Sequence, residues 1–434
     1  MRLSLAELEE MAARRSPAGL LAISEAIART GGCAQPVRLK ANGRGSPSVG
    51  QPEGVVLVAC KTRRETRCPS CAETYKGDAK QLVRAGIEGG KGVPETVSGH
   101  PAVFVTLTAP GFGAVHRAVS GQCHPVLAGR CHHGRDLFCP ESHAEPDEVV
   151  GTPLCPDCYD YEAAVMFNAS VTALWHRVTI YARRHLAYVM GMTERQLRTE
   201  VRLSYLKVAE LQARGVVHLH AIVRADSAGE EVEPPGIAIR SDLLAEAIVR
   251  AAQSASVGAV AEGQVFRFAF GEQVTVDPLK AGDVAKIASY LSKYLVKSAS
   301  GTAALDHRLR EGELDHIELP DHLRRIVATA WRLGSSDGTG RLRRWAHALG
   351  YPGHLLTKSP RFSTTFGKLQ QARAEWHKQD ADDARPEDHS HLSWEFAGAG
   401  HTWPIDHVIA ATVAAQRDQS RRVAWEELTS VDGD

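Results

Sequence analysis

The stretch Gly215-Val-Val-His218-Leu-His220-Ala-Ile-Val-Arg224 places two histidines in an alternating apolar run. Such a run predicts a half-buried strand, in which side chains at positions i and i+2 share a face. We therefore expect His218 and His220 to point the same way, while the apolar residues between and beside them face a core. Two imidazoles on one face are within reach of one divalent ion.

The segment before the histidines offers a third ligand. Residues 201–212 predict a strand that turns through Ala213-Arg-Gly215 into the histidine strand. This hairpin brings Glu210 or Gln212 near the histidines. Either side chain supplies the oxygen that a hard catalytic cation such as Mg²⁺ or Mn²⁺ prefers.

A pair of tyrosines follows later in the chain. Residues 283–297 predict a helix with an acidic start and a basic end, which suits the helix dipole. Tyr290 and Tyr294 are separated by about one helical turn, with Lys293 between them, so both phenols lie on one face.

The composition is that of an ordinary globular protein. The 434 residues are 43% hydrophobic and 24% charged, with a formal net charge of zero, and this length holds two or three domains. No apolar run approaches the roughly 20 residues that cross a bilayer, and the acidic start does not suit a signal peptide. We expect a cytoplasmic protein with no membrane partner, in which any nucleic-acid binding depends on local basic patches.

Nine cysteines in a cytoplasmic protein favour metal sites over disulfides. Arg67-Cys68-Pro-Ser-Cys71 has the spacing of a zinc knuckle and leads into a predicted helix. Together with Cys33 and Cys60 upstream, Cys68 and Cys71 form one candidate all-cysteine Zn²⁺ site.

A loop-rich insert at about residues 121–160 holds most of the remaining cysteines. Its Cys/His-rich stretches include a second Cys-x-x-Cys pair, and its apolar residues are too few for folding by burial alone. We predict a structural Zn²⁺ site whose first-choice ligands are Cys131, Cys139, Cys155 and Cys158.

Other ligand sets for the insert stay open. His133 or His143 replaces one of the cysteines in one alternative, and the two Cys-x-x-Cys pairs share one ion in another. Cys123 is interpreted as a packing residue.

Residues 321–378 form a basic and aromatic segment. Lys and Arg outnumber Asp and Glu there, and aromatic residues are interleaved with them. This pattern favours a surface that tracks phosphates. The candidate DNA-binding residues are Arg341, Arg343, Arg344, Lys358 and Arg361.

No nucleotide-binding motif is found in the sequence. The stretch Gly89-Gly-Lys-Gly-Val-Pro94 lacks the spacing of a P-loop, and none occurs elsewhere. We therefore expect chemistry without a nucleotide cofactor.

The order of the expected elements indicates the fold class. A strand near residues 100–108 precedes the insert and a helix, and two strands, a helix, two strands and the tyrosine helix follow. This order is typical of an α+β protein with an antiparallel sheet and flanking helices.

A metal-binding strand followed by a tyrosine helix resembles the HUH endonucleases, which include rolling-circle replication initiators, relaxases and related transposases. The Tyr-x-x-Lys-Tyr form is similar to the two-tyrosine initiators. Further stretches resemble, in the same order, replication initiator proteins of actinobacterial plasmids and integrative conjugative elements. They are Arg67–Tyr75, Phe104–Pro110, Leu154–Tyr161, Trp345–Gly350 and Thr357–Gly367. The likeness covers roughly residues 30 to 375.

The resemblance implies an HUH-type sheet and metal-dependent nicking of DNA at a replication origin. A tyrosine hydroxyl would attack the scissile phosphate and keep the 5′ end as a phosphotyrosine ester. Tyr290, Tyr294 and Lys293 would be catalytic, and His218, His220 and Glu210 would hold Mg²⁺ or Mn²⁺. The resemblance favours Glu210 over Gln212, because an acid eight residues before the first histidine is similar to several rolling-circle initiators.

The resemblance also implies partners and a division of the chain. The partners would be single-stranded and duplex origin DNA and a host helicase and polymerase. The expected segments are a helical, zinc-binding region at 1–95, a nicking domain at 96–300 that contains the insert, a DNA-binding extension at 301–378, and a linker with a C-terminal helix at 379–434.

Two other functions stay open. A relaxase or transposase would use the same chemistry on a different DNA site. A non-catalytic, zinc-stabilised DNA-binding regulator would have structural histidines and packed tyrosines, and would bind duplex DNA without cutting it.

Overall fold

The computed structural model describes residues 16–42, 55–125, 129–145, 147–300, 305, 307–336, 340–379 and 393–431. Residues 1–15 and 380–392, which hold the start of the predicted N-terminal region and most of the predicted linker, lie outside these ranges. The chain forms two compact units, one of residues 1–78 and 370–434 and one of residues 79–369. The division into four functional segments stays a prediction.

The first unit contains a small antiparallel sheet of order β10-β1-β2 and two helices. Its elements are α2 (Pro17–Arg29), β1 (Val37–Asn42), β2 (Val55–Val58), β10 (Ser393–Ala399) and α11 (Pro404–Val431). Ser16 caps α2 by accepting a hydrogen bond from the Gly19 amide at 3.1 Å. Ile23 and Ile27 of α2 pack against Ala410 of α11, so sequence-distant helices share this core.

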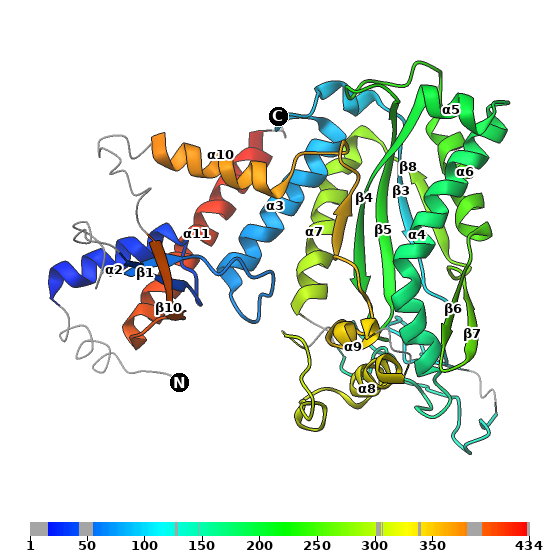
Figure 1. The fold of residues 1–434 in the computed structure, drawn as a ribbon, viewed down its shortest axis with the longest axis horizontal. Coiled ribbons are helices and arrows are strands. Elements are labelled where there is room, and N and C mark those ends of the chain that lie inside the picture. The colour runs from blue at the N-terminus through cyan, green and yellow to red at the C-terminus, as the bar shows by residue number, and fades with distance from the viewer. Residues whose placement is uncertain are drawn as a thin grey trace. The chain divides into compact units, whose positions relative to one another are not determined.

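The second unit contains a five-stranded sheet of order β8-β3-β5-β4-β9, in which all neighbours are antiparallel. The predicted mixture of helices with an antiparallel sheet is confirmed. The elements are β3 (Ala102–Leu107), α4 (Tyr161–Val189), α5 (Glu194–Glu200), β4 (Val201–Leu211), β5 (Val217–Ser227), α6 (Ser241–Ser254), β6 (Val257–Ala261), β7 (Gln264–Phe268), β8 (Val274–Pro278), α7 (Val284–Ser300), α8 (Asp321–Ser336), α9 (Arg341–Trp345) and β9 (Leu356–Lys358). Figure 1 shows β3, β4 and β5 side by side.

The boundary between the units falls within two helices, α3 (Pro69–Glu88) and α10 (Phe366–Gln379). Short 3₁₀ turns lie at Glu95–Gly99, Ala281–Asp283, Leu314–His316 and Ala346–Ala348. Strand β7 is one of the two strands expected just before the tyrosine helix, and it pairs with β6, a strand that the sequence did not predict.

The hairpin of β4 and β5 fixes which residues meet. In the antiparallel register Glu210 lies opposite His218, and on the other side of β5 Thr106 of β3 lies opposite His220. The pairing of residues 201–212 with the histidine strand is therefore as predicted.

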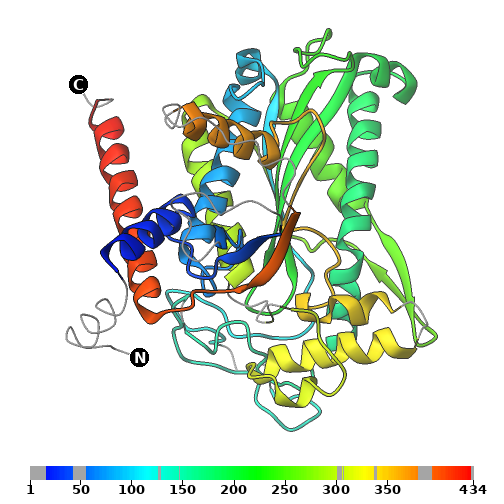
Figure 2. The ribbon, with the colours of Figure 1, turned by 60° about the vertical axis from the view of Figure 1, so that its left-hand side comes forward.

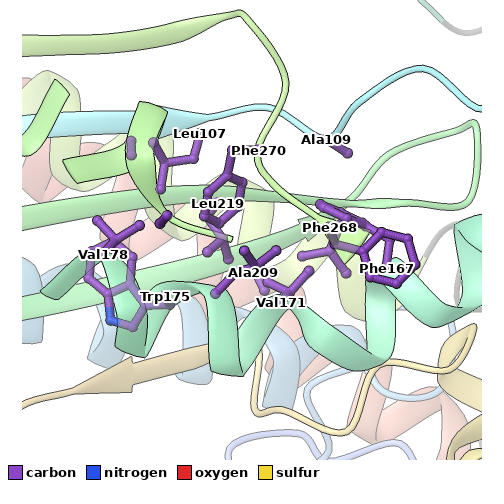
Figure 3. Close-up of a cluster of buried hydrophobic side chains, with 14 of the residues drawn as sticks. Leu107, Ala109, Phe167, Val171, Trp175, Val178, Ala209, Leu219, Phe268 and Phe270 are labelled. Atoms are coloured by element: carbon purple, nitrogen blue, oxygen red, sulfur yellow. The ribbon is translucent and has the colours of Figure 1, made fainter. Parts of the chain in front are cut away.

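One face of the sheet packs on α4. The odd-numbered residues of β5 from Val217 to Ala225 belong to the main core, together with residues of α4 and α6. Figure 3 shows Val171 of α4 close to Ala209 and Leu219 of the strands, and Phe167 of α4 beside Phe268 of β7. Burial of this apolar face at roughly 25 cal/mol per Å² is the main force that holds the sheet to its helices.

The opposite face of β5 carries polar side chains that are also buried. The Arg224 guanidinium contacts both Asp226 oxygens, at 2.6 and 3.0 Å, and His100 contacts the same carboxylate at 2.8 Å. Arg224 also donates to the Gly86 carbonyl of α3 and lies over the Phe362 ring. These partners satisfy the charges that the strand places under cover.

The loop-rich insert lies beside α8 in both ribbon views (Figures 1 and 2). Arg325 of α8 forms an ion pair with Asp157 of the insert at 3.0 Å. Among the helices of the described segments, none is long and apolar enough to cross a membrane.

Lys207 is an uncompensated charge on the α4 side of β4. It is 4% exposed, and within the described part of the chain no ion pair or hydrogen bond involves its ammonium. Burial lowers the pKa of Lys207 from 10.5 to about 8.

Replacing this lysine by Met is expected to stabilise the protein at pH 7 by roughly 1–3 kcal/mol, because Met fills similar space without a charge. In the wild type the folded state releases the Lys207 proton near pH 8, whereas the unfolded chain holds its proton to about pH 10.5. The wild type therefore gains stability between these pH values, and Lys207→Met lacks that gain. Urea unfolding at pH 7 and 9.5 measures the difference.

The matched control is Lys286→Met, which removes an exposed lysine and should leave the unfolding free energy unchanged at both pH values. The lowered pKa of Lys207 would be contradicted if the unfolding free energies of Lys207→Met and the wild type differed by the same amount at pH 7 and at pH 9.5.

Candidate active site and metal centres

His218 and His220 of β5 lie on the face of the sheet opposite α4. Their rings are stacked with centroids 4.6 Å apart. His220 is almost fully buried and His218 partly so. The shared face follows from strand alternation.

His220 contacts residues from three other elements. Its Nε2 lies 3.3 Å from Oε2 of Glu210 on β4 and 3.5 Å from the hydroxyl of Tyr290 on α7. Its Nδ1 lies 3.2 Å from the Thr106 hydroxyl of β3. When Nδ1 donates its proton to Thr106, the Nε2 lone pair points at the place where the carboxylate and the phenol meet.

His218 is held by a chain of hydrogen bonds from the β4–β5 turn. The Gln212 side chain lies 2.8 Å from His218 Nδ1, and Arg214 Nε donates to Gln212 Oε1 at 2.9 Å. Arg214 also donates to the carbonyls of Ala109 and Pro110 at 3.0 Å each. These bonds fix the imidazole relative to the end of β3.

The surroundings of His218 favour the neutral form of its ring. Burial, and then the nearby His220 and Arg214, lower the pKa of His218 to about 3. Its Nε2 is buried and has no hydrogen-bond partner among the described residues. A buried ring nitrogen without a partner on a neutral imidazole is a suitable donor for a cation.

Cation binding at His218 Nε2 would rearrange the hydrogen bonds that link Arg214, Gln212 and His218. The Nδ1 atom would then carry the proton, so the Gln212 amide would have to turn its oxygen toward the ring. Arg214 would lose its bond to Gln212 and keep the two bonds to backbone carbonyls.

The donor atoms of His218, His220 and Glu210 are not all within 4.8 Å of one another, in contrast to three other groups of described residues. A cation held by all three residues therefore requires rotation of at least one of these side chains. The orphaned Nε2 of His218 and the Glu210–His220 contact fit such a site.

Tyr290 and Tyr294 share one face of α7, with ring centroids 4.5 Å apart. The Tyr290 ring is nearly perpendicular to the rings of His220 and of Phe104 on β3, at centroid distances of 5.1 and 6.1 Å. Burial, Tyr294 and the charge of Glu210 raise the pKa of Tyr290 above its usual value. The phenol therefore keeps its proton in this environment. Lys293 lies exposed on the same helix.

The structure shows a positioning residue that the sequence analysis missed. Asn168 of α4 is fully buried, and its amide nitrogen donates to the carbonyls of Gly215 and Leu349 at 2.9 and 2.8 Å. Its oxygen accepts from the Val217 amide at 2.9 Å. Asn168 thus fixes the backbone just before His218. A polar residue inside an apolar helical pattern was the available signal.

The four cysteines Cys33, Cys60, Cys68 and Cys71 lie together in the first unit, with all sulfurs within 4.8 Å. This is the group predicted from the sequence. Backbone amides of Ala34 and Cys60 donate to the sulfurs of Cys68 and Cys33 at 3.3 and 3.2 Å. Amide donors of this kind stabilise thiolates, which are the form that binds Zn²⁺.

The insert contains two clusters where the sequence analysis predicted one. Cys131, Cys155 and Cys158 lie together as predicted, but the fourth member is His133, the alternative named above. His133 Nδ1 lies 3.2 Å from the Cys158 sulfur. The two Cys-x-x-Cys pairs lie in different clusters, so they do not share one ion.

Cys139 lies in a separate cluster, with His116, Cys123 and His143. The first-choice grouping of Cys139 with Cys131 is therefore corrected. Cys123 faces two histidines in addition to being buried, so packing alone does not describe it. The spacing Cys139-x-x-x-His143 was a signal for this cluster.

The predicted DNA-binding residues occupy two places. Arg341 and Arg344 of α9 are exposed. Arg343 lies 3.9 Å from the Trp331 ring centroid and pairs with Glu311. Near β9, the Lys358 ammonium donates to three backbone carbonyls, the nearest that of Ser363 at 2.8 Å. The guanidinium of exposed Arg361 donates to the Gly229 carbonyl. Arg341 and Arg344 therefore have the freest guanidinium groups of the set.

The fold and these clusters define a mixed helical and antiparallel-sheet protein with candidate Cys/His metal sites. Residues 20–415 match the family described as "RepSA: Replication initiator protein, pSAM2". A replication initiator protein of Streptomyces ambofaciens is 40% identical over 399 residues, which cover 87% of this chain and 84% of the relative. The chain belongs to this family of replication initiator proteins, as the resemblance predicted. No solved structure matches the chain significantly.

Asn168→Ala is expected to destabilise the protein by about 2–4 kcal/mol, because two carbonyls and one amide lose their only side-chain partner in a buried place. Urea unfolding measures the loss. The control is Thr179→Ala on the exposed side of the same helix, for which little change is expected. Equal losses in the two variants would show that Asn168 does not hold the turn.

Proposed function

We propose that this replication initiator nicks origin DNA by metal-dependent tyrosine transesterification and so starts rolling-circle replication. The observation that carries the proposal is the meeting of the Tyr290 hydroxyl, the His220 Nε2 atom and the Glu210 carboxylate on one covered face of the sheet. Family membership supports the role at an origin. The proposal includes an HUH-type fold for residues 96–300.

Tyr290 is the proposed first nucleophile, because its hydroxyl contacts His220 directly. Its oxygen forms a bond to the scissile phosphorus and the bond from phosphorus to the 3′ oxygen breaks. The phenol proton passes to solvent, and the leaving 3′ oxygen takes up a proton from solvent. The DNA then has a free 3′ hydroxyl for the polymerase and a 5′ end on Tyr290. The ester keeps the energy of the phosphodiester, so rejoining requires no nucleotide cofactor.

Because the pKa of Tyr290 is raised, the reaction needs a nearby positive charge that favours the phenolate. A Mg²⁺ or Mn²⁺ ion bound at His218, His220 and Glu210 would supply positive charge that favours the phenolate and neutralises the phosphate oxygens. Thr106 and Gln212 orient the two imidazoles. Lys293 adds a further positive charge on the helix that carries both tyrosines.

Tyr294 is proposed as the second nucleophile. Its ring lies 4.5 Å from that of Tyr290 and 5.5 Å from that of His220, measured between centroids. Two phenols beside one imidazole suit two successive strand transfers, one that starts replication and one that ends it.

The remaining parts of the chain are proposed to stabilise the nicking domain and to bind DNA. Zn²⁺ would be held by Cys33, Cys60, Cys68 and Cys71, and in the insert by Cys131, His133, Cys155 and Cys158. Arg341, Arg344 and their neighbours in residues 301–378 would contact origin DNA phosphates in single-stranded or duplex form. A host helicase and polymerase would act on the nicked origin in the cytoplasm.

The test is a cleavage assay with Mn²⁺ on single-stranded oligonucleotides that tile the origin of the element. The wild type is expected to give a covalent protein–DNA band that disappears with EDTA. Tyr290→Phe should reduce this band at least about 10³-fold, because the nucleophile is lost. Tyr294→Phe should keep first cleavage and lose the second transfer.

Tyr188→Phe, a change at an exposed tyrosine of α4, is the matched control and should cleave like the wild type. Specific binding to duplex origin DNA without any covalent band, on every strand tested, would refute the nicking mechanism. The zinc-stabilised regulator would then be the better account.

A further inference from the structure

His116, Cys123, Cys139 and His143 form a four-residue group, here called the Cys₂His₂ cluster, near the start of the insert. All four donor atoms lie within 4.8 Å of one another. His143 Nε2 is 3.2 Å from His116 Nδ1 and 3.3 Å from the Cys139 sulfur. The Cys123 sulfur is 4.0 Å from His116 Nδ1.

Two of these distances lie close to the edges of a tetrahedral zinc site, and the distance from Cys123 to His116 is slightly longer than such an edge. Nitrogen and sulfur ligands at about 2.0–2.3 Å from Zn²⁺ stand roughly 3.3–3.8 Å from one another. Two neutral imidazoles and two thiolates compensate the charge of the ion.

Backbone groups and one carboxylate contact the residues of the cluster. The Arg117 amide donates to the Cys123 sulfur at 3.1 Å, and the backbones of His124 and Cys139 exchange hydrogen bonds of 2.8 and 3.1 Å. An Asp147 oxygen lies 3.9 Å from Nδ1 of His143, the ring nitrogen away from the cluster. Such contacts orient ligands around structural metal ions.

The cluster also borders a cavity beside the candidate active site. The cavity has a volume of about 650 Å³, within the range of small-ligand sites. The sheet contributes Glu210, Gln212 and Arg214 to its lining, and the insert contributes His116, Arg117 and Glu145. His116, one residue of the cluster, therefore lines the same cavity as Glu210, and so does Arg117, whose amide donates to the Cys123 sulfur.

We propose that the Cys₂His₂ cluster binds a third Zn²⁺ ion, separate from the two zinc sites above, and that this ion fixes the wall of the cavity next to Glu210. The role of the wall rests on the proposed function: the cavity would hold a nucleotide of single-stranded DNA that flanks the scissile phosphate. Metal binding itself is independent of that function.

The first test is the zinc content of the full-length protein, measured by elemental analysis. Cys123→Ser/Cys139→Ser is expected to contain one zinc ion per chain fewer than the wild type. Cys131→Ser/Cys155→Ser, the matched control in the neighbouring cluster, should also lose one ion, and the combined variant should lose two. Wild-type zinc content in Cys123→Ser/Cys139→Ser would overturn the proposal.

The second test keeps the site intact, so that misfolding of the serine variant does not decide the result. His143→Cys should retain the zinc content of the wild type, because a thiolate replaces an imidazole as ligand. After exchange into Co²⁺, this variant should show stronger sulfur-to-cobalt absorption than the wild type, in proportion to one more sulfur ligand. An unchanged Co²⁺ spectrum would exclude His143 as a ligand.

The wall is tested by binding of single-stranded origin oligonucleotides. Cys123→Ser/Cys139→Ser is expected to bind them about 10-fold or more weakly, whereas His143→Cys should bind like the wild type. Loss of zinc with unchanged DNA affinity would overturn the role of the wall and leave the metal site in place. A wild type that binds zinc but shows no nicking would refute the proposed function alone.

Discussion

Strand β5 is buried along nearly its whole length, and this constraint governs the rest of the second unit. Its odd-numbered side chains from Val217 to Ala225 are apolar and complete the core against α4 and α6. Its even-numbered side chains include His218, His220, Arg224 and Asp226, and strand alternation forces all four under cover on the opposite face. A buried polar group without a partner costs about 1–3 kcal/mol. Each of these four residues therefore needs partners from elsewhere in the fold.

The partners divide the polar row into two parts with different consequences. At the Asp226 end, Arg224 and His100 contact the carboxylate, and backbone carbonyls accept the remaining guanidinium bonds. The Nε2 atom of His100 has no hydrogen-bond partner among the described residues, but no exposed reactive group of those residues contacts it. At the His218 end, the Nε2 atom of His218 also has no such partner, and the phenol of Tyr290, which is 40% exposed, approaches the ring of His220. An unsatisfied ring nitrogen close to an accessible phenol is the arrangement expected of a binding or catalytic site.

Local chemistry made part of this arrangement predictable from the sequence. The period of two in the histidine strand and the turn before it were enough to bring Glu210 or Gln212 near the histidines, and the four-residue tyrosine spacing placed both phenols on one face. The Cys-x-x-Cys pairs likewise identified two of the three candidate metal clusters, because the two cysteines of such a pair are close together in the sequence.

What the sequence left open depends on long-range pairing. Strands β9 and β10 join sheets whose other members lie far away in the chain, and nothing in a three-residue strand such as Leu356–Lys358 indicates its neighbour. The partition of cysteines and histidines in the insert failed for the same reason, since ligands separated by loops are brought together only by the folded backbone. Asn168 was missed because its three partners are backbone atoms, which leave no trace in a residue pattern.

The insert and the histidine site are joined by a short chain of hydrogen bonds, and this explains why a loop-rich segment lies beside a covered sheet. Tyr159, one residue after the Cys155–Cys158 knuckle, donates to the Arg214 carbonyl at 3.0 Å. The Arg214 side chain holds Gln212, and Gln212 contacts His218. Tyr159 is itself buried in the main core of the second unit, so this contact ties the end of the insert to the turn that carries Gln212. Zinc bound at the neighbouring Cys155 and Cys158, as proposed above, would add a second constraint on the position of Tyr159. It would thereby act on a side chain of the candidate active site through groups that do not themselves touch the ion.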